Sequence, residues 1–412
     1  MVQYKMLIQE PTISSIFSAL AESWHDPVLR HWRWQRLRGR VKPVADARAR
    51  PGDGMAEGAG LYLTGLTAKD EEGAAKGLHL LFGAAQQAIG ASGASLEGST
   101  LRQAQLAHLT ARAWLAARRA GRPEQWRLAT VARSVIAAYD ALHLPGGLPE
   151  IGEKPEGLES VSPFDDLSEA DSRAVEELRR QGKLHDLEAL RRDGWLRLDN
   201  GPWSGLWHCP QSGWPSFKGL AHHDLGAPEL HWNGLPLLVD PGSAEEDLAP
   251  LYRSAVSHGG LTLDRQNPYP ETRAGYSDPF RREVAGPDPE LRATHDGVKL
   301  AMDGFGRFGG HKQIERFWRF DGPSLRIEDI VLGTGRPLIE RRLITPWVAS
   351  REEGGVLLSH GEHQLRLTAI GAISLQPFKR WNPRGDEMPL TRIVIAVRAN
   401  LPWSGALTLQ PA

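Results

Sequence analysis

Four residues of the kinds that bind metals and move protons lie close together in this sequence. His222, Asp224, Asp240 and His258 fall within 37 residues. Imidazole and carboxylate groups are together the donors that a zinc ion selects, and strand-and-turn spacing can bring three of them to one point. The types and spacing of these residues therefore predict a metal site. The alternative interpretation is that these side chains are hydrogen-bonded residues of an ordinary β-sandwich.

The elements that would position these residues are short strands. From Trp195 onward, brief apolar runs are separated by Gly, Pro and Asp, which is typical of an antiparallel β-sandwich. The runs include residues 195–198, 235–239, 261–263, 325–330, 365–368 and 393–397.

Residues 54–144 follow a different period. They are rich in Ala and Leu, and apolar residues recur three and four positions apart, which predicts helices. Breakers at 90–98, 121–123 and 145–147 would divide these helices into antiparallel pairs, the unit of an α/α toroid or a bundle. We therefore predict a helical domain over 1–150, an acidic linker and charged helix over 151–193, and a β-sandwich domain over 194–412.

Composition limits the classes of partner and compartment. The length of 412 residues suffices for two domains, and a net charge of −1 offers no overall field for nucleic acid or a membrane surface. No apolar stretch approaches 18 residues, so no transmembrane helix is expected. The N-terminus lacks the apolar region of a secretory signal, which indicates a cytoplasmic protein, although an incomplete start would leave a periplasmic location open. The single cysteine, Cys209, rules out an intrachain disulfide framework.

A separate N-terminal segment, Trp24 to Arg40, interleaves tryptophans with arginines. Such a pattern could bind single-stranded nucleic acid or an acidic glycan. We favour the alternative, an amphipathic helix that packs its tryptophan face on the helical domain.

The run from Gly219 to His258 resembles the signature of the heparinase II/III-like polysaccharide lyases. That signature contains Gly-His-x-His-Ala-Asp, then an apolar strand ending in Val-Asp-Pro-Gly, then Tyr/Phe-Arg-Ser and a later His. This chain has Val239-Asp240-Pro241-Gly242 and Tyr252-Arg253-Ser254 at the matching places. The resemblance extends over 194–345 and, with weaker motifs, over 56–148.

The resemblance implies an incomplete α/α toroid followed by a layered antiparallel β-sandwich. It also implies cleavage of an anionic, uronic-acid-containing polysaccharide, of glycosaminoglycan or alginate type, by β-elimination. In that reaction a base removes the proton beside the sugar carboxylate, an acid protonates the departing oxygen, and polar groups stabilise the developing negative charge.

Position by position, the resemblance makes His222, Asp240 and His258 ligands of a structural zinc ion, with Asp224 supporting them. The first His of the family motif falls on Leu220, which cannot move a proton. His223 would replace it only if a backbone bulge turned its side chain into the cleft, since alternation along a strand points it away from the face of His222.

Tyr252 is the main proton-transfer candidate, with a packed strand aromatic as the alternative. We expect substrate binding by Arg253, and by Arg102, the one residue retained from a Gly-rich loop that carries Asp, His and Arg in the family.

Two other functions stay open at this point. The missing histidine at Leu220 also fits a catalytically degenerate relative that binds glycan or a protein partner. A less favoured interpretation makes the zinc catalytic in a hydrolase, with Asp224 as the base. The sequence leaves the sugar, the linkage and the oligomeric state open.

Overall fold

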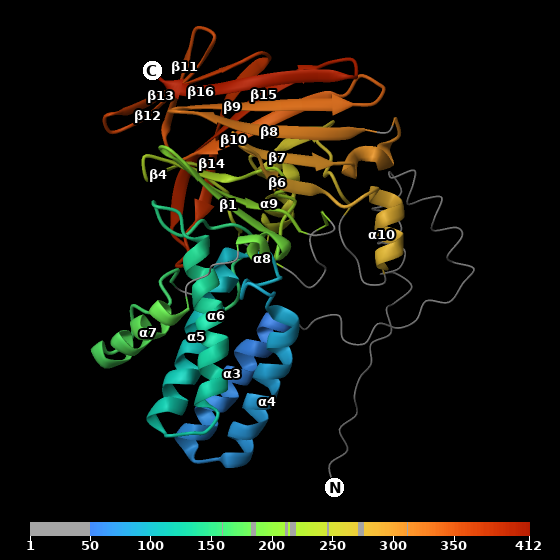
Figure 1. Cartoon of the computed structure of the whole chain (residues 1–412). Coiled ribbons are helices and arrows are strands. Elements are labelled where there is room, and N and C mark those ends of the chain that lie inside the picture. The colour runs from blue at the N-terminus through green and yellow to red at the C-terminus, as the bar shows by residue number, and fades with distance from the viewer. Residues whose placement is uncertain are drawn as a thin grey trace, which may run out of the picture.

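The computed structural model describes residues 50–412 apart from 159, 183–186, 211–212, 215–219, 245–246, 271–275 and 311. The segment Trp24 to Arg40 therefore lies outside the described residues. Four long helices form one end of the molecule and stacked antiparallel sheets form the other (Figure 1). None of the described helices has the length and hydropathy that crossing a bilayer requires.

The helical part consists of two antiparallel helix pairs. These are α3 (Pro51–Ala68) with α4 (Glu71–Ala88), and α5 (Thr100–Arg119) with α6 (Gln125–Leu142). Helix α4 begins where the side chain of Asp70 accepts a hydrogen bond from the amide of Gly73, and α5 begins with the equivalent bond from Arg102 to Ser99. Small residues, mostly alanines, line the buried faces, so the helices approach closely. Two shorter helices, α7 (Glu169–Gln181) and α8 (Leu187–Arg192), lead to the first strand.

The described residues of the β part form three antiparallel sheets. The first is formed by β1 (Trp195–Asn200), β2 (Trp203–His208), β3 (Glu229–Trp232) and β4 (Leu235–Leu238), in that order. The second has the order β14 (Ala372–Trp381), β15 (Glu387–Arg398), β10 (Leu338–Thr345) and β5 (Leu261–Leu263).

The third and largest sheet has eight strands. Its order is β11 (Val348–Glu352), β12 (Gly355–His360), β13 (His363–Ala369), β16 (Trp403–Pro411), β9 (Ser324–Leu332), β8 (Gln313–Asp321), β7 (Gly297–Met302) and β6 (Glu290–Ala293). Residues of β8 and β9 alternate between buried and less buried positions, as strands with one face on a core must. Short helical segments connect the sheets: α9 (Ala249–Arg253), η1 (Ala255–Ser257), α10 (Asp278–Ala285) and η2 (Gly304–Phe308).

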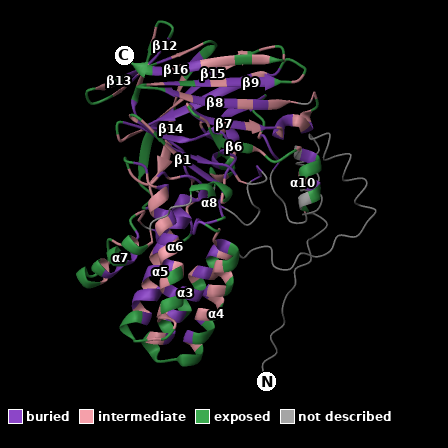
Figure 2. Cartoon of the chain, in the orientation of Figure 1, coloured by how far each residue is buried: buried purple, intermediate pink, exposed green. Residues whose placement is uncertain are grey.

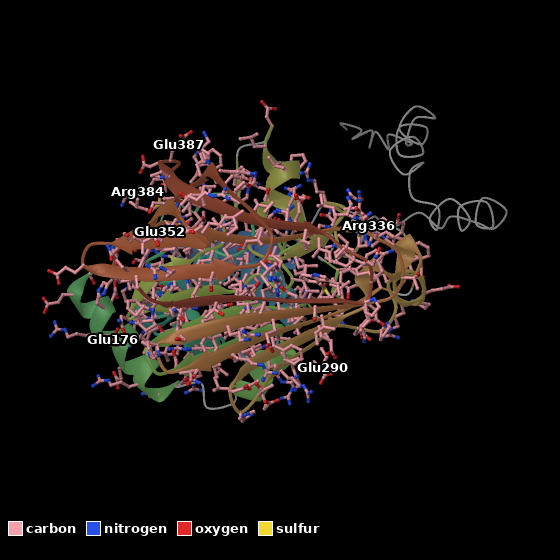
Figure 3. The ribbon with its side chains drawn as sticks, turned by 90° about the horizontal axis from the view of Figure 1, so that it is seen from above. Glu176, Glu290, Arg336, Glu352, Arg384 and Glu387 are labelled. Carbon is pink, nitrogen blue, oxygen red and sulfur yellow. The ribbon has the colours of Figure 1, made fainter. Side chains whose placement is uncertain are left out.

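One large core joins the sheets, and a second core fills the helical part (Figure 2). A smaller cluster links the two, because Leu142, Leu144 and Ile151 pack against Trp195 and Leu206 of the first sheet. Charged residues of both signs lie around the outside of the molecule, including Glu290, Arg336 and Glu387 (Figure 3). The predicted architecture, a partial toroid followed by an antiparallel sandwich, is confirmed.

Candidate metal centre and domain seam

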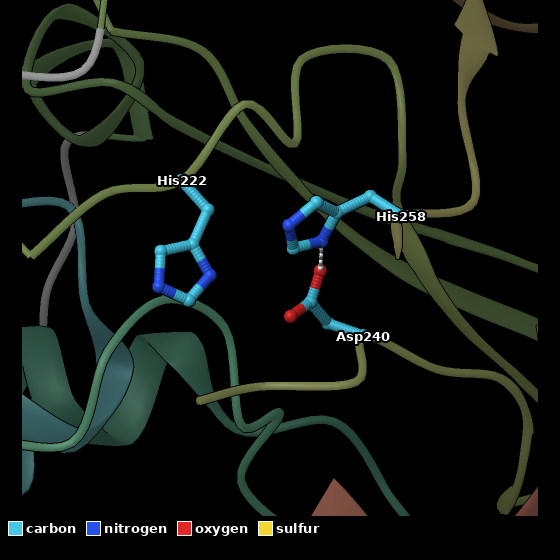
Figure 4. A group of neighbouring side chains, drawn as sticks. All are labelled: His222, Asp240 and His258. Carbon is cyan, nitrogen blue, oxygen red and sulfur yellow. Dashed lines mark hydrogen bonds and ion pairs between the residues drawn. The ribbon is translucent and has the colours of Figure 1, made fainter. Parts of the chain in front are cut away.

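The side chains of His222, Asp240 and His258 meet at one point. Each offers a ligand atom, and these atoms lie within 4.8 Å of one another (Figure 4). His222 comes from the loop between β2 and β3, Asp240 follows β4, and His258 follows η1. All three residues are buried, at 2%, 2% and 0% exposure. The predicted convergence is therefore confirmed, and three separate loops supply the group.

The hydrogen bonds of His258 fix which of its nitrogens faces the group. Its Nε2 lies 2.7 Å from the carbonyl oxygen of Tyr252, and its Nδ1 lies 2.7 Å from Oδ2 of Asp240. A carbonyl oxygen only accepts, so Nε2 must donate. Nδ1 then faces a carboxylate that also only accepts, and a proton or a metal ion between them removes the conflict. Burial opposes the charged imidazole, but the Asp240 carboxylate outweighs it and raises the pKa of His258.

His222 completes a donor set that suits a metal. Both of its ring nitrogens are buried, and neither has a hydrogen-bond partner among the described residues. Burial, followed by the nearby His258, lowers the pKa of His222 well below its ordinary value, so its imidazole is neutral at pH 7. Neutral imidazole is the form that binds a metal, and a buried nitrogen without a partner is costly unless something occupies it. The residues present therefore fit a zinc ion.

A chain of hydrogen bonds ties Asp240 to the helical part. The backbone amide of Asp240 lies 3.3 Å from Oε2 of Glu229, whose other oxygen is 3.3 Å from Nε2 of His231. Nδ1 of His231 accepts from the amide of Gly146, at 3.0 Å. A Cβ atom at Gly146 would lie 2.7 Å from Nδ1 of His231, so only glycine allows this close approach. Asp240 is thus positioned partly by the loop that follows α6.

Tyr252 and His223, the two predicted proton-transfer residues, differ in their hydrogen bonding. The hydroxyl of Tyr252 donates to the carbonyl oxygen of Lys379 at 2.6 Å, its ring stacks on Phe378, and burial raises its pKa to about 12. His223 is buried with no partner for Nδ1 among the described residues. Burial, and next the positive charge of Arg307, lower the pKa of His223 to about 3.

Leu220 stands at the seam between the two parts of the molecule. Its amide donates to the carbonyl oxygen of Glu97 at 2.6 Å, and its carbonyl oxygen accepts from the amide of Glu153 at 2.8 Å. The residue is fully buried. At this position the chain therefore contributes backbone contacts between the domains and no group that titrates.

The two predicted substrate-binding arginines occupy different environments. Arg253 is half exposed and pairs with Glu153 across the seam, at 2.5 and 3.0 Å. Arg102 is 1% exposed. Its guanidinium group donates to Glu97, Gln105 and Asp53 at 2.8, 2.5 and 2.5 Å. This geometry favours a role for Arg102 in holding its own loop and runs against the predicted contact with substrate.

His208, the last residue of β2, is a buried histidine outside the set predicted from the sequence. Its Nδ1 lies 3.1 Å from Oδ1 of Asp224, and both side chains are buried. The negative charge of Asp224 also raises the pKa values of His222 and His258, so this carboxylate lies near the predicted metal ligands as well. The only sequence signal was a polar residue at the end of the strand Trp203–His208, all six residues of which are buried.

Comparisons with known proteins agree with this architecture. The family model described as Heparinase II/III-like, C-terminal matches residues 182–399. The structure is similar to that of heparinase III, with a TM-score of 0.61 and 13% identity, over 87% of this chain and 61% of that one. It is also similar to a mutant of the heparan sulfate lyase HepC from Pedobacter heparinus, with a TM-score of 0.59 and 13% identity, over 96% of this chain and 64% of that one. This chain thus spans less than two thirds of either structure, and no curated protein sequence matches it.

Proposed function

Because this chain belongs to the heparinase II/III-like family of polysaccharide lyases, we propose that it cleaves an anionic, uronic-acid-containing glycan by β-elimination. The observation that carries the proposal is the buried group of His222, Asp240 and His258 next to the seam between helices and sandwich. A family fold alone does not specify chemistry, so the site has to support the reaction.

We infer that the three side chains hold a structural zinc ion, which would cross-link the loops after β2, β4 and η1 when bound. The carbonyl of Tyr252 would keep His258 in the tautomer with Nδ1 free for the metal, as a hydrogen bond to the far nitrogen does in other metal sites. Gly242 supports Asp240 in the same way, since its amide donates to Oδ1 at 2.8 Å.

Two side chains near this group are candidates for proton transfer. Tyr252 keeps its proton at neutral pH, because its pKa is raised, and can act as an acid toward a departing oxygen after leaving the Lys379 carbonyl. His223 is the other candidate, but it is neutral at the same pH and its pKa of about 3 makes it a weak base. Arg253 is the predicted cation that would pair with the uronate carboxylate, because a half-exposed arginine can exchange Glu153 for a ligand.

The test is incubation of the purified protein with a panel of polysaccharides: heparan sulfate, hyaluronan, alginate and polygalacturonate. Elimination creates a carbon–carbon double bond conjugated with the carboxylate, so the ultraviolet absorbance should rise with time for at least one of them. Absence of any rise, from protein shown to contain zinc, would contradict the proposal.

Leu220 favours a second candidate function, a catalytically degenerate member that only binds glycan. A leucine with its backbone tied to Glu97 and Glu153 can neither transfer a proton nor neutralise a carboxylate. This candidate predicts saturable binding of one of the same polysaccharides, measured by calorimetry, without product. Slow product formation that Tyr252→Phe abolishes would exclude it.

A further inference from the structure

The end of β14 meets the helical part of the molecule beside Tyr252. The hydroxyl of Tyr252 donates to the carbonyl oxygen of Lys379 in this strand, at 2.6 Å. Just beyond the strand, the carbonyl oxygen of Pro383 accepts from Nζ of Lys154 at 2.9 Å. Lys154 belongs to the segment 150–154, which crosses the seam after α6. Side chains at the end of β14 therefore lie next to the proposed acid.

Arg380, the residue after Lys379, has a guanidinium group that forms no hydrogen bond with any described residue. Its Nη2 lies 3.9 Å from Oε1 of Glu150, which is an ion-pair distance but too long for a hydrogen bond. Its Nε is buried without a partner in the described part of the chain. Arg316, by contrast, donates to both oxygens of Asp329, at 2.6 and 3.2 Å. Unpaired donors of a largely buried arginine are costly, so this guanidinium group suits an anionic ligand.

Arg380 can be reached from solvent. Its side chain is 13% exposed, whereas the side chain of Arg102 is 1% exposed. Nε is the one nitrogen of Arg380 that is both enclosed and without a partner among the described residues, so Nη1 and Nη2 remain accessible. β14 is also an edge strand of its sheet, and the nearby side chains of Lys379 and Arg253 are 41% and 49% exposed. A carboxylate that approaches this part of the seam can therefore contact the tip of the guanidinium group.

Glu150 holds Arg380 loosely. Burial raises the pKa of Glu150, Arg380 opposes this rise, and the negative charges of Glu229 and Asp240 add to it. Glu150 thus lies close enough to Asp240 to be repelled by it, and it contacts Arg380 only at the long distance given above. A second carboxylate with better geometry can replace it.

We propose that Arg380 is a specificity-determining residue that binds a uronate carboxylate of the polysaccharide beside Tyr252, an inference that rests on the proposed function. Arginine presents parallel N–H groups that match the two oxygens of a carboxylate. Glu150 orients the guanidinium group in the free protein, and the sugar carboxylate takes its place. Uronate units recur along such a polysaccharide, so Arg253 and Arg380 bind carboxylates of different units.

The experiment compares binding of two forms of one polysaccharide by calorimetry. The first form is the panel polysaccharide that the wild type binds most tightly, and the second is the same material with its carboxylates reduced to alcohols. Arg380→Met should weaken binding of the first form roughly 10- to 100-fold, the range for a hydrogen bond to a charged group. Its affinity for the reduced form should equal that of the wild type. Arg380→Lys, which keeps the charge but loses the paired donors, should fall between the two.

Two further variants show whether Arg380 acts on the ligand or only on the fold. Glu150→Gln removes the competing carboxylate, so it should bind the first form at least as tightly as the wild type. Arg366→Met is the matched control, because Arg366 pairs with Glu352 at 3.2 Å in the eight-stranded sheet, and it should leave binding unchanged. Thermal melts and zinc content show that each variant is folded. If Arg380→Met does not fold, Arg380→Lys makes the same comparison.

The outcomes separate this inference from the proposed function. Unchanged binding by Arg380→Met, or an equal loss for both forms of the polysaccharide, would overturn the role of Arg380 and leave a wild type that forms product as a lyase. Glu150→Gln that loses as much affinity as Arg380→Met would also overturn it, because a pair that only joins the domains predicts that result. A wild type that binds through Arg380 but forms no product would contradict the lyase proposal alone. A wild type that binds none of the polysaccharides would contradict both.

Discussion

At the scale of single residues, hydrogen-bond partners decide what each buried histidine can do. His222 has two nitrogens without partners among the described residues, which suits a metal ligand. His258 has both nitrogens engaged, and its Nδ1 lies beside the Asp240 carboxylate, so the two groups can bind one cation together. His208 has one nitrogen held by Asp224 and the other directed at the seam.

Replacement of Asp240 should separate metal binding from folding. We expect Asp240→Asn to lose bound zinc, because an amide is a weak ligand and cannot pair with His258 as a carboxylate does. The measurement is zinc per chain by atomic emission, together with a thermal melt.

The matched control for Asp240→Asn is Asp329→Asn. Asp329 is also fully buried, but it pairs with Arg316 at 2.6 Å in the large sheet. Breaking that pair should cost about 3–5 kcal/mol of unfolding free energy and leave the zinc content unchanged. Equal zinc content in both variants would argue against the metal site.

Replacing Arg102 should mainly lower stability, whereas replacing Arg253 should mainly weaken polysaccharide binding. Arg102→Met leaves Glu97 buried without its cation, so we expect a loss of about 3–5 kcal/mol in unfolding free energy. Arg253→Met removes a half-exposed pair and should cost less than about 1 kcal/mol, while KM for the polysaccharide rises. Denaturant melts and steady-state kinetics measure the two effects. A stable Arg102→Met protein with a raised KM would reverse our assignment.

The sequence could predict that His222, Asp240 and His258 come together, but not that His208 pairs with Asp224. His222, Asp240 and His258 were found because their spacing follows a family signature. His208 and Asp224 come from different elements and meet only in the folded chain. The ion pairs of Arg102 could not be predicted, because its position in a motif says nothing about its burial and its partner Asp53 is 49 residues away.

At the scale of elements, close packing of α3 on α4 depends on glycines. A Cβ atom at Gly58 would clash with the backbone of Leu81, whereas one at Gly60 would meet nothing within 4 Å. Gly58→Ala should therefore force the helices apart and lower the free energy of unfolding by about 1–3 kcal/mol. Gly60→Ala, on the same helix, should stabilise it by about 0.5–1 kcal/mol. Thermal melts of the two variants check this, and a shift of the same sign in both would count against the close approach of α3 and α4.

Periodicity in the sequence was enough to predict the helices and the sandwich. The breakers at 90–98 and 121–123 fall in the loops between α4 and α5 and between α5 and α6. The order of strands within the sheets could not be predicted, because β16 pairs with β9 across more than 70 residues and no local pattern records such a partner. The predicted packing of the Trp24–Arg40 segment stays a prediction.

At the scale of the whole molecule, the group of His222, Asp240 and His258 and the pair of His208 and Asp224 both lie near the seam between the helices and the sandwich. Backbone bonds through Leu220, the Arg253–Glu153 pair and the bond from Gly146 to His231 all cross it. A metal ion bound by His222, Asp240 and His258 would therefore cross-link three loops beside this seam.

Removal of the metal should weaken this seam without unfolding the chain outright. Dialysis against a chelator should lower the melting temperature, because zinc at about 1,000 times its Kd contributes roughly 4 kcal/mol to the folded state. Adding zinc back should restore it. Loss of activity at unchanged melting temperature would instead indicate a catalytic metal.

The most direct test of the central claim is the fate of water during cleavage. The protein is incubated with its best polysaccharide, and the products are weighed by mass spectrometry. Elimination adds no water, so one fragment should carry a new double bond and weigh one water less than the corresponding saturated fragment. Fragments that are all saturated, each cleavage having gained one water, would indicate hydrolysis and contradict the account.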